Sequence, residues 1–383
     1  MPAHPATARV DVVRLWQLPD DFFARPLDEQ WAAVKAVTAP APELAAPRRA
    51  CVLSFTDDAL ATGFFLATLA LPFGLALSFL YFLYHGSRAP TAALVVVAAV
   101  LALHPLPRAP SLAFRSSRLA LALARYFTME MLCDRSDPFV TDYCTPGVDA
   151  AAFLERSLPS VYLACPHGVF NYGAMVWCCF MRWACGWYQY TGAAAAVRHA
   201  PGLRLMDPLI WLIEADRKSI TAALRERGPL DAVDGERKGG VVGMVPDGIL
   251  GAFRSRPGRD ELAIGKRRGL LRICLQEGAV VHGAWFFGTP DMLTVVQDPF
   301  GIMEFLSRKA RAGVMYFYGR WFLPVPRRVA VTVCVAPVST VKTADPSRAA
   351  LDALHDEVYG KLQKVYDDQK RFAGYPDRTL IIT

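Results

Sequence analysis

The sequence contains no pair of cysteines at Cys-x-x-Cys spacing, although it has nine cysteines in all. The missing spacing argues against a structural zinc site, so we expect no bound metal. The odd number of cysteines and their apolar surroundings favour buried, reduced thiols and a catalytic portion that faces the cytosol. Residues 1–30 include several acidic side chains and no apolar run, which predicts no cleavable signal peptide.

Charged residues are also scarce, at 20% of the chain against 53% hydrophobic residues. This composition excludes a disordered chain, a collagen-like chain and a basic tail that binds nucleic acid. Basic and acidic side chains balance over residues 1–108, so the net charge of +7 lies in residues 109–383. Such an excess is typical of an evenly solvated surface, or of a basic face toward anionic lipid or a phosphate-bearing ligand.

Two common catalytic motifs are missing. The glycines at 239, 240 and 243 are not followed by Lys-Ser or Lys-Thr, which argues against a phosphate-binding P-loop. The chain also has no Gly-x-Ser-x-Gly, which argues against an α/β-hydrolase.

The hydrophobicity is concentrated in two uncharged runs near the N-terminus. Ala59–Tyr84 would form a helix of about 39 Å, longer than the roughly 30 Å hydrocarbon core of a bilayer. Pro72 and Gly74 predict a kink within it. Thr91–Leu103 is shorter, so we expect two passes joined by a tight turn or one re-entrant hairpin. Neither run has a polar face, which argues against a buried soluble pair.

The flanks of these runs suggest how the chain is organised. Basic residues lie outside the pair, which favours a cytosolic position for both ends. We expect a loosely ordered cytosolic N-terminal tail at 1–50, with a short helix at Asp28–Val37, then a membrane hairpin at 51–108 and a cytosol-facing domain at 109–383. Arg115, Arg118 and Arg125 share one helical face, which predicts an interfacial helix on anionic lipid or a plain amphipathic connector.

Beyond about Ala151, short apolar runs alternate with helical patterns. The expected strands are Ser160–Cys165, Gly239–Val245, Ala279–Phe287 and Val329–Val335. The expected helices are Asn171–Cys185, Asp216–Arg227, Lys266–Glu277 and a C-terminal helix with Asp345 as its N-cap and Pro346 in its first turn. This alternation predicts an α/β fold with a mostly parallel sheet covered by helices on both faces.

In such sheets the chemistry gathers where parallel strands end. Two expected strands end in polar turns, one containing His167 and the other containing Asp247. A histidine and a carboxylate at one sheet edge can form a general base and its partner. Each residue alone also fits an ordinary structural role in its loop.

Several blocks of the sequence resemble one known family. Tyr162–Gly168 (YLACPHG) resembles the strand and His-Pro-His-Gly motif of the type-2 diacylglycerol acyltransferase family, which also contains monoacylglycerol and wax-alcohol acyltransferases. Further blocks resemble that family in the same order: Asp216–Ile220, Val241–Ile249, Lys266–Gly288, Gly319–Arg328 and the C-terminal Phe372, Pro376 and Leu380. The resemblance implies a glycerolipid-acyltransferase-like α/β fold, and the preceding hairpin suits a membrane anchor.

Two positions depart from the family pattern. The first His of His-Pro-His-Gly is Cys165 here, and the Glu of the later Gly-Gly-Ala-x-Glu block is Asp247. The second His of the motif is retained as His167. The His-x-x-x-x-Asp pair of glycerolipid acyltransferases is absent, because Tyr172 stands where the Asp would be.

The resemblance implies transfer of a fatty acyl group from acyl-CoA to the hydroxyl of diacylglycerol, forming triacylglycerol. A thioester is already activated, so we expect acyl-CoA as co-substrate and no cofactor. His167 is the expected general base, and Asp247 is expected to hold its tautomer or contact the acceptor headgroup. Gly168 and the helix start at Asn171 are candidate oxyanion donors. Cys165 is either a nucleophile or a packed thiol.

A basic stretch follows the second motif. Its members are Arg254, Arg256, Arg259, Lys266, Arg267, Arg268 and Arg272. They are candidates for binding the phosphates of acyl-CoA, although a solvated or lipid-facing stretch has the same composition.

Several questions stay open on the sequence alone. Diacylglycerol is the leading acceptor, and monoacylglycerol or a long-chain alcohol is the alternative. The departures at Cys165 and Asp247 also keep a catalytically degenerate, lipid-binding membrane relative open. The family resemblance implies the endoplasmic reticulum membrane, and lipid droplets as a second location. Homo-oligomer formation is open as well.

Overall fold

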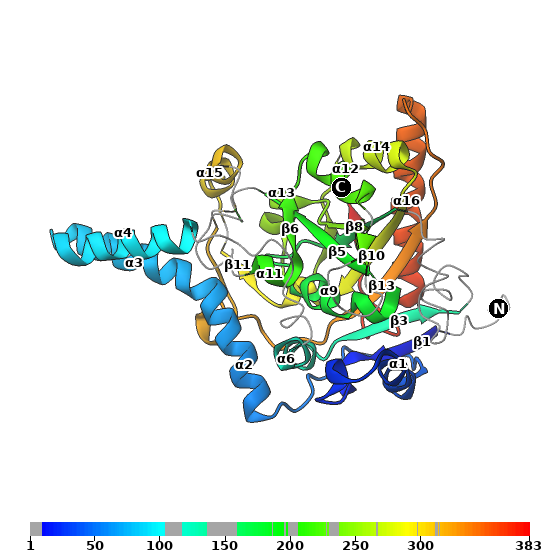
Figure 1. The fold of residues 1–383 in the computed structure, drawn as a ribbon, viewed down its shortest axis with the longest axis horizontal. Helices are drawn as coiled ribbons and strands as arrows, with labels where there is room; N and C mark the ends of the chain where they lie inside the picture. Colours follow the sequence, from blue (N-terminus) through cyan, green and yellow to red (C-terminus); the bar gives the residue numbers. More distant parts are fainter. Residues whose placement is uncertain are drawn as a thin grey trace.

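A computed structural model of the protein describes residues 10–103, 117–135, 159–185, 187–194, 197, 206–226, 228–229, 237–265, 267–296, 298–310, 313 and 315–383. Arg115 and Lys266, which the sequence analysis singled out, lie outside these ranges. A large twisted sheet forms the centre of the molecule, and a pair of helices projects from one end of it (Figure 1).

The described residues form a 10-stranded sheet. In spatial order its strands are β2 (Thr38–Pro40), β1 (Val10–Arg14), β3 (Glu130–Asp134), β13 (Thr332–Val338), β10 (Val280–Phe287), β4 (Ser160–Cys165), β8 (Arg237–Met244), β5 (Trp187–Ala193) and β6 (Leu212–Glu214), with β7 (Gly228–Pro229) paired to β8. The run from β10 to β6 is parallel throughout. The expectation of a mostly parallel sheet is therefore confirmed.

Helices cover both faces of this sheet. One face carries α12 (Arg217–Arg225), α14 (Gly269–Glu277) and α16 (Arg348–Gln369), while the other carries α6 (Arg118–Tyr126) and α9 (Tyr172–Cys185). Strand β4 is buried along its whole length, which explains why its sequence is a continuous apolar run. Val161, Leu163 and Cys165 belong to the hydrophobic core on the α12, α14 and α16 side of the sheet. Tyr162 and Ala164 belong to the core on the α6 and α9 side.

Smaller elements complete the described fold. They are α1 (Leu27–Ala36), α11 (Asp207–Ile210), α13 (Gly248–Arg254), α15 (Ile302–Ala310) and two short ribbons, β9 (Asp260–Leu262) with β14 (Leu380–Ile382) and β11 (Thr294–Val295) with β12 (Phe317–Tyr318).

The N-terminal segment is better ordered than the sequence analysis predicted. Strand β1 pairs antiparallel with β3 and extends the central sheet, so residues 10–40 are not a loosely ordered tail. Leu15 and Phe22 are fully buried in the core on the α9 side. The predicted short helix is present as α1.

Two predicted boundaries near the C-terminus were wrong. The last strand was expected at Val329–Val335, but its pairing with β10 runs from Thr332 to Val338. The final helix was expected to be capped by Asp345, but Ser347 is its N-cap and accepts a hydrogen bond from the Ala350 N–H at 3.1 Å. Ser is as good an N-cap as Asp, so composition alone does not choose between them.

The long apolar run divides into two parts with different surroundings. Helix α2 (Phe55–Phe65) and a π-helical turn at Leu66–Ala70 lie against α6, with Ala61 and Phe65 fully buried. After a bend, α3 (Leu71–Tyr84) and α4 (Arg88–Leu103) form a hairpin that projects from the domain (Figure 1). We call α3 and α4 together the helical arm.

No single helix among the described residues is long and apolar enough to cross a membrane. The pair Phe55–Ala70 and Gly74–Tyr84, bent by 45°, meets the length and composition criteria together. The bend coincides with the predicted kink at Pro72 and Gly74.

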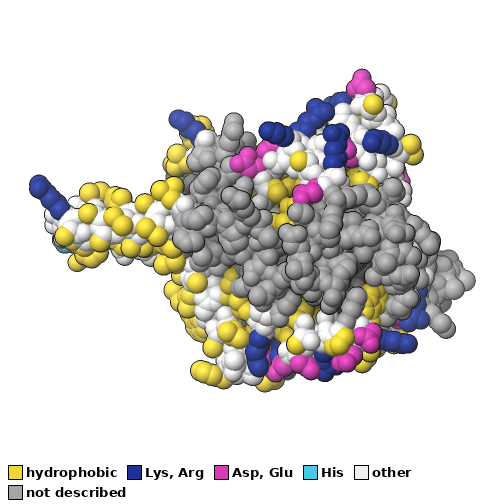
Figure 2. Space-filling model, in the orientation of Figure 1, with side chains coloured by type: hydrophobic (Ala, Val, Ile, Leu, Met, Phe, Trp, Pro, Cys, Tyr) yellow, Lys and Arg dark blue, Asp and Glu magenta, His cyan; other side chains and the backbone are white. Residues whose placement is uncertain are grey.

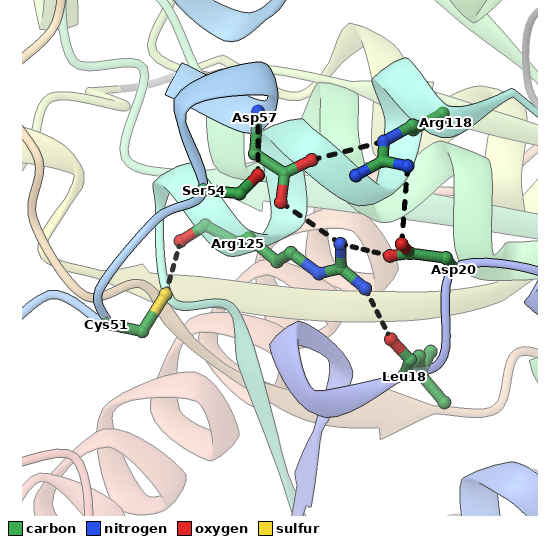
Figure 3. A network of polar contacts seen from close by, with 7 residues as sticks. All are labelled: Leu18, Asp20, Cys51, Ser54, Asp57, Arg118 and Arg125. Atoms are coloured by element: carbon green, nitrogen blue, oxygen red, sulfur yellow. Dashed lines mark hydrogen bonds and ion pairs between the residues drawn. The ribbon is translucent and has the colours of Figure 1, made fainter.

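Helix α6 does not lie on a lipid surface, which corrects one of the two predictions for it. Its residues 120–124 are buried, and its two arginines face acids of the same chain (Figure 3). Arg125 donates to Asp57 of α2 at 3.1 Å, to Asp20 at 2.6 Å and to the carbonyl of Leu18 at 2.8 Å. Arg118 lies 3.5 Å from the Asp57 carboxylate and 3.3 Å from Asp20. The four charged side chains join α2, α6 and the N-terminal segment.

This network predicts an asymmetry between its two arginines. Arg125→Leu leaves the buried Asp57 carboxylate without its close partner and should lower the free energy of unfolding by about 3–5 kcal/mol. Arg118→Leu removes a half-exposed side chain at longer range and should cost about 1 kcal/mol or less. Thermal unfolding of the two variants in the same detergent makes the comparison. Equal losses of melting temperature would contradict a dominant role for Arg125.

Candidate active site

The two predicted motifs meet at one edge of the sheet. Strands β4 and β8 are parallel neighbours, with Leu163 opposite Met244, so the turns that follow them emerge side by side. The backbone N–H of His167 donates a hydrogen bond to Oδ2 of Asp247 at 3.1 Å. The structure therefore brings together the histidine and the carboxylate that the sequence analysis placed at this edge.

The carboxylate contacts the backbone of His167 and not its ring, which differs from the predicted arrangement. Nδ1 of the imidazole lies 3.0 Å from the carbonyl oxygen of Gly168. A carbonyl oxygen only accepts hydrogen bonds, so Nδ1 carries the proton in this arrangement and Nε2 carries the lone pair. The ring of His167 is thus oriented by its own loop, in a half-buried position.

Asp247 is 0% exposed. Burial raises the pKa of its carboxyl group, and the opposing influences are the nearby His167 and the guanidinium of Arg267. Its other oxygen, Oδ1, has no hydrogen-bond partner within the described part of the chain. A buried acceptor without a partner is costly, because it loses its hydrogen bonds to water and gains none in return.

Glycines allow the two turns to approach so closely. Gly168 has φ +59°, and a Cβ there would lie 2.8 Å from the Thr289 side chain in the turn after β10. Gly251, one helical turn after Asp247 in α13, is more tightly placed, because a Cβ on it would lie 1.9 Å from Oδ2 of Asp247. A Cβ at either position would force the neighbouring Thr289 or Asp247 side chain to move.

The side chain of Asn171, at the predicted helix start, makes hydrogen bonds of its own. Its side-chain amide donates to the carbonyl of Pro166 at 2.9 Å, and its Oδ1 accepts from the N–H of Ala174 at 2.9 Å. Asn171 therefore caps α9 and ties it to the loop that carries His167. These contacts engage the Asn171 side chain, so the backbone N–H groups of Gly168 and of the helix start both stay predicted oxyanion donors.

Cys165 is a packed thiol. It is fully buried on the α16 side of the sheet, and burial, together with the charge of Asp247, raises its pKa. A thiol that stays protonated and inaccessible is not a nucleophile. Within the described residues no group of three His, Cys, Asp or Glu side chains could hold a metal ion.

A comparison with known protein families finds a match over this part of the chain. A family model described as diacylglycerol acyltransferase matches residues 157–383, which include both turns of the site. The chain belongs to the diacylglycerol acyltransferase family. No solved structure matches it significantly.

Curated relatives of this family member are distant. It is 23% identical to a 2-acylglycerol O-acyltransferase 1 of Bos taurus over 44% of this chain and 51% of the relative. It is 30% identical to an acyl-CoA wax alcohol acyltransferase 1 of Homo sapiens, over 36% of this chain and 45% of the relative. A diacylglycerol O-acyltransferase 2 of Dictyostelium discoideum is 25% identical over 34% and 43%. The chain thus spans about half the length of the curated relatives it matches.

In this diacylglycerol acyltransferase family member, one of the predicted phosphate-binding arginines lies at the site. The guanidinium of Arg267 donates to the carbonyls of Pro246 and Asp247, at 3.1 and 3.2 Å, and the side chain is exposed. It therefore places a positive charge beside the turn that carries Asp247.

The other described candidates have partners elsewhere on the surface. Arg254 and Arg259 share Glu261, at 3.0 and 2.9 Å. Arg268 pairs with Asp352 at 3.0 Å, and Arg272 lies 3.7 Å from Asp345. Arg256 donates to the carbonyls of Phe253 and Ser255, both at 2.8 Å. Five of the seven predicted residues thus hold surface elements together, and Lys266 lies outside the described residues.

Sequence reasoning missed Gly251, Thr289 and the apolar wall of the site. Phe65 of α2 stacks edge-on against Tyr172 with ring centroids 4.9 Å apart, and Phe170 stacks against Phe317 at 5.7 Å. The bent helix therefore touches the start of α9, next to the His167 loop. The sequence spacing alone could have identified Gly251, because residues four apart on a helix are neighbours on its surface and Gly251 follows Asp247 by four.

The close approach of Gly251 to Asp247 predicts an unusual outcome for a glycine-to-alanine substitution. Alanine normally stabilises a helix relative to glycine by roughly 0.5–1 kcal/mol. Gly251→Ala should instead displace the Asp247 carboxylate and reduce acyl transfer at least tenfold, because the His167 loop loses its partner.

Gly360 of α16 provides the matched control, because a Cβ there meets nothing within 4 Å. Gly360→Ala should leave activity unchanged and raise the melting temperature slightly. Activity assays and thermal unfolding of both variants, in the same membranes, test the prediction. A Gly251→Ala enzyme that keeps its full activity would show that Asp247 does not position the loop.

Proposed function

We propose that this chain is an acyl-CoA-dependent O-acyltransferase that transfers a fatty acyl group to the hydroxyl of a neutral lipid, with diacylglycerol as the leading acceptor. One observation carries the proposal: the His167 imidazole is oriented through Nδ1 by the Gly168 carbonyl, which leaves Nε2 as an acceptor at the sheet edge. Membership of the diacylglycerol acyltransferase family supports the same chemistry.

In the proposed reaction, Nε2 of His167 takes the proton of the acceptor hydroxyl while the hydroxyl oxygen attacks the thioester carbonyl. The resulting oxyanion would be stabilised by a backbone N–H in the loop around Gly168. Collapse of the tetrahedral intermediate forms the ester and breaks the carbon–sulfur bond, and the CoA thiolate recovers the proton from the imidazolium. No covalent enzyme intermediate is needed, which agrees with the buried, protonated Cys165.

The charges around the site suit both partners of this reaction. The Asp247 carboxylate binds the backbone N–H of His167, and its negative charge favours the imidazolium that forms during the reaction. The exposed guanidinium of Arg267 can meet a phosphate of acyl-CoA at the mouth of the turn. Its two hydrogen bonds to backbone carbonyls hold the guanidinium in place without neutralising it.

The acceptor remains the open part of the proposal. The relatives are named for different acceptors, a monoacylglycerol, a wax alcohol and a diacylglycerol. We propose further that the protein is bound to the endoplasmic reticulum membrane, with its catalytic domain on the cytosolic side, and that lipid droplets are a second location. The bent pair Phe55–Ala70 and Gly74–Tyr84 supports membrane association through its combined length and composition.

The base assignment predicts the behaviour of His167→Gln. Glutamine preserves the size and hydrogen-bonding capacity of the side chain but cannot accept a proton at neutral pH. The variant should be produced at normal level and should lose about 10²–10⁴-fold in acyl transfer. The assay uses labelled acyl-CoA and membranes with matched expression, followed by separation of the lipid products.

The same assay, run with diacylglycerol, monoacylglycerol and a long-chain alcohol in parallel, identifies the acceptor. We expect triacylglycerol to be the main product of the native chain. Formation of a different ester that His167→Gln abolishes would keep the mechanism and change the acceptor. Absence of any product with all three acceptors would favour a lipid-binding relative without activity.

A further inference from the structure

A tight turn exposes two neighbouring aromatic side chains. Trp321 and Phe322 have φ values of +55° and +59°, a region that side chains other than glycine rarely occupy. Their exposed fractions are 59% and 81%. Two such residues in succession are unfavourable, and strain of this kind persists only where the surroundings impose it.

Hydrogen bonds of Gly319 and Arg320 hold the backbone of this turn in its unfavourable conformation. The N–H of Gly319 donates to the carbonyl of Leu323, and the N–H of Arg320 donates to the carbonyl of Val325, both at 2.7 Å. The guanidinium of Arg320 binds Asp58 of α2 at 3.0 Å and the Tyr126 hydroxyl at 3.2 Å, and it stacks on Trp321 at 4.1 Å from the ring centroid. The turn is therefore built rigidly, with its aromatic rings in solvent.

Helix α15 exposes a second apolar surface. Phe305 is 64% exposed, and Ile302 and Leu306 beside it are also exposed. The inward face of α15 holds Ser307, which is buried, and Met303, which packs against the core, so the exposed apolar residues form a separate outer face. Lys309, at the end of the same helix, is exposed. An apolar face bordered by a basic residue is typical of helices that lie in the interface of a bilayer.

Both features lie at the end of the molecule that carries the helical arm. Figure 1 shows α15 at the same end as α3 and α4, and the turn is tied to α2 through Arg320 and Asp58. Hydrophobic side chains cover the visible length of the arm (Figure 2). The turn, α15 and the arm therefore belong to one end of the protein, and all three present exposed aromatic rings.

We propose that the turn Gly319–Leu323 and the exposed face of α15 insert into the surface of a lipid bilayer, beside the point where the helical arm enters it. Tryptophan and phenylalanine on a rigid turn suit the boundary between headgroups and acyl chains. Lys309 suits anionic headgroups. The domain is thus seated on the membrane by three contacts, with the start of α2 beneath the turn. The inference goes beyond acyl transfer, and its test does not depend on activity.

Depth-dependent quenching tests the proposal directly. The full-length protein is placed in nanodiscs of phosphatidylcholine and phosphatidylserine, with or without bromine at the middle of the acyl chains. Subtracting the emission of Trp321→Phe from that of the native chain isolates the Trp321 signal. We expect brominated lipid to quench at least half of that signal. An unquenched signal would overturn the proposal, whether the ring lies in water or against a second copy of the chain.

Control variants make the result specific. Trp16, which donates to Glu130 among the N-terminal strands at 3.4 Å, should remain unquenched by the same subtraction with Trp16→Phe. Phe322→Ser should reduce the quenching of Trp321 at least twofold. Val341→Ser, at an equally exposed apolar residue in the loop after β13, should not change it. Equal quenching of Trp16 and Trp321, or equal effects of the two serine variants, would contradict insertion of this turn.

Discussion

One hydrogen bond, from the N–H of His167 to the fully buried carboxylate of Asp247, joins the two turns that form the site. Hydrogen bonds to a carboxylate are stronger than those between neutral groups, and a buried acceptor that loses its donor is costly. Gly251 allows the carboxylate to take its position, and Asn171 ties the other turn to α9. Helix α2 also contacts the start of α9, because Phe65 packs on Tyr172, the residue after Asn171. The His167 loop thus lies between the sheet and the helices that lead into the helical arm.

Much of the central sheet could be predicted from the sequence, and the reason differs between strands. The continuous apolar run of β4 is typical of a strand buried on both faces, and its bounds were correct. Helix α12 was predicted at Asp216–Arg227 from its local pattern, and in the structure Asp216 is its N-cap and accepts from the Ser219 N–H at 2.8 Å. Strand β1 could not be found in this way, because its short mixed sequence becomes a strand only by pairing with distant β3. The start of β13 likewise depends on its partner β10.

The site shows the same division between local pattern and distant contact. Parallel strands that end together made the meeting of His167 and Asp247 predictable, but not which atoms would meet. The spacing could not reveal that the carboxylate binds the backbone N–H while the ring binds Gly168. The charge of the basic stretch could be counted from the sequence, but its partners could not be found there: Arg268 and Arg272 pair with Asp352 and Asp345, which lie far along the chain. Arg267 differs from them only through its position in the fold.

The central claim is that Asp247 acts through His167, and a double-mutant cycle on acyl-transfer rates tests it most directly. The four enzymes are the native chain, Asp247→Ala, His167→Gln and the double variant, assayed with labelled acyl-CoA at matched expression. If the carboxylate only positions the loop and supports the imidazolium, Asp247→Ala lowers the native rate at least tenfold but leaves the residual rate of His167→Gln unchanged. If Asp247→Ala lowers both rates by the same factor, the two residues act independently and the account is contradicted.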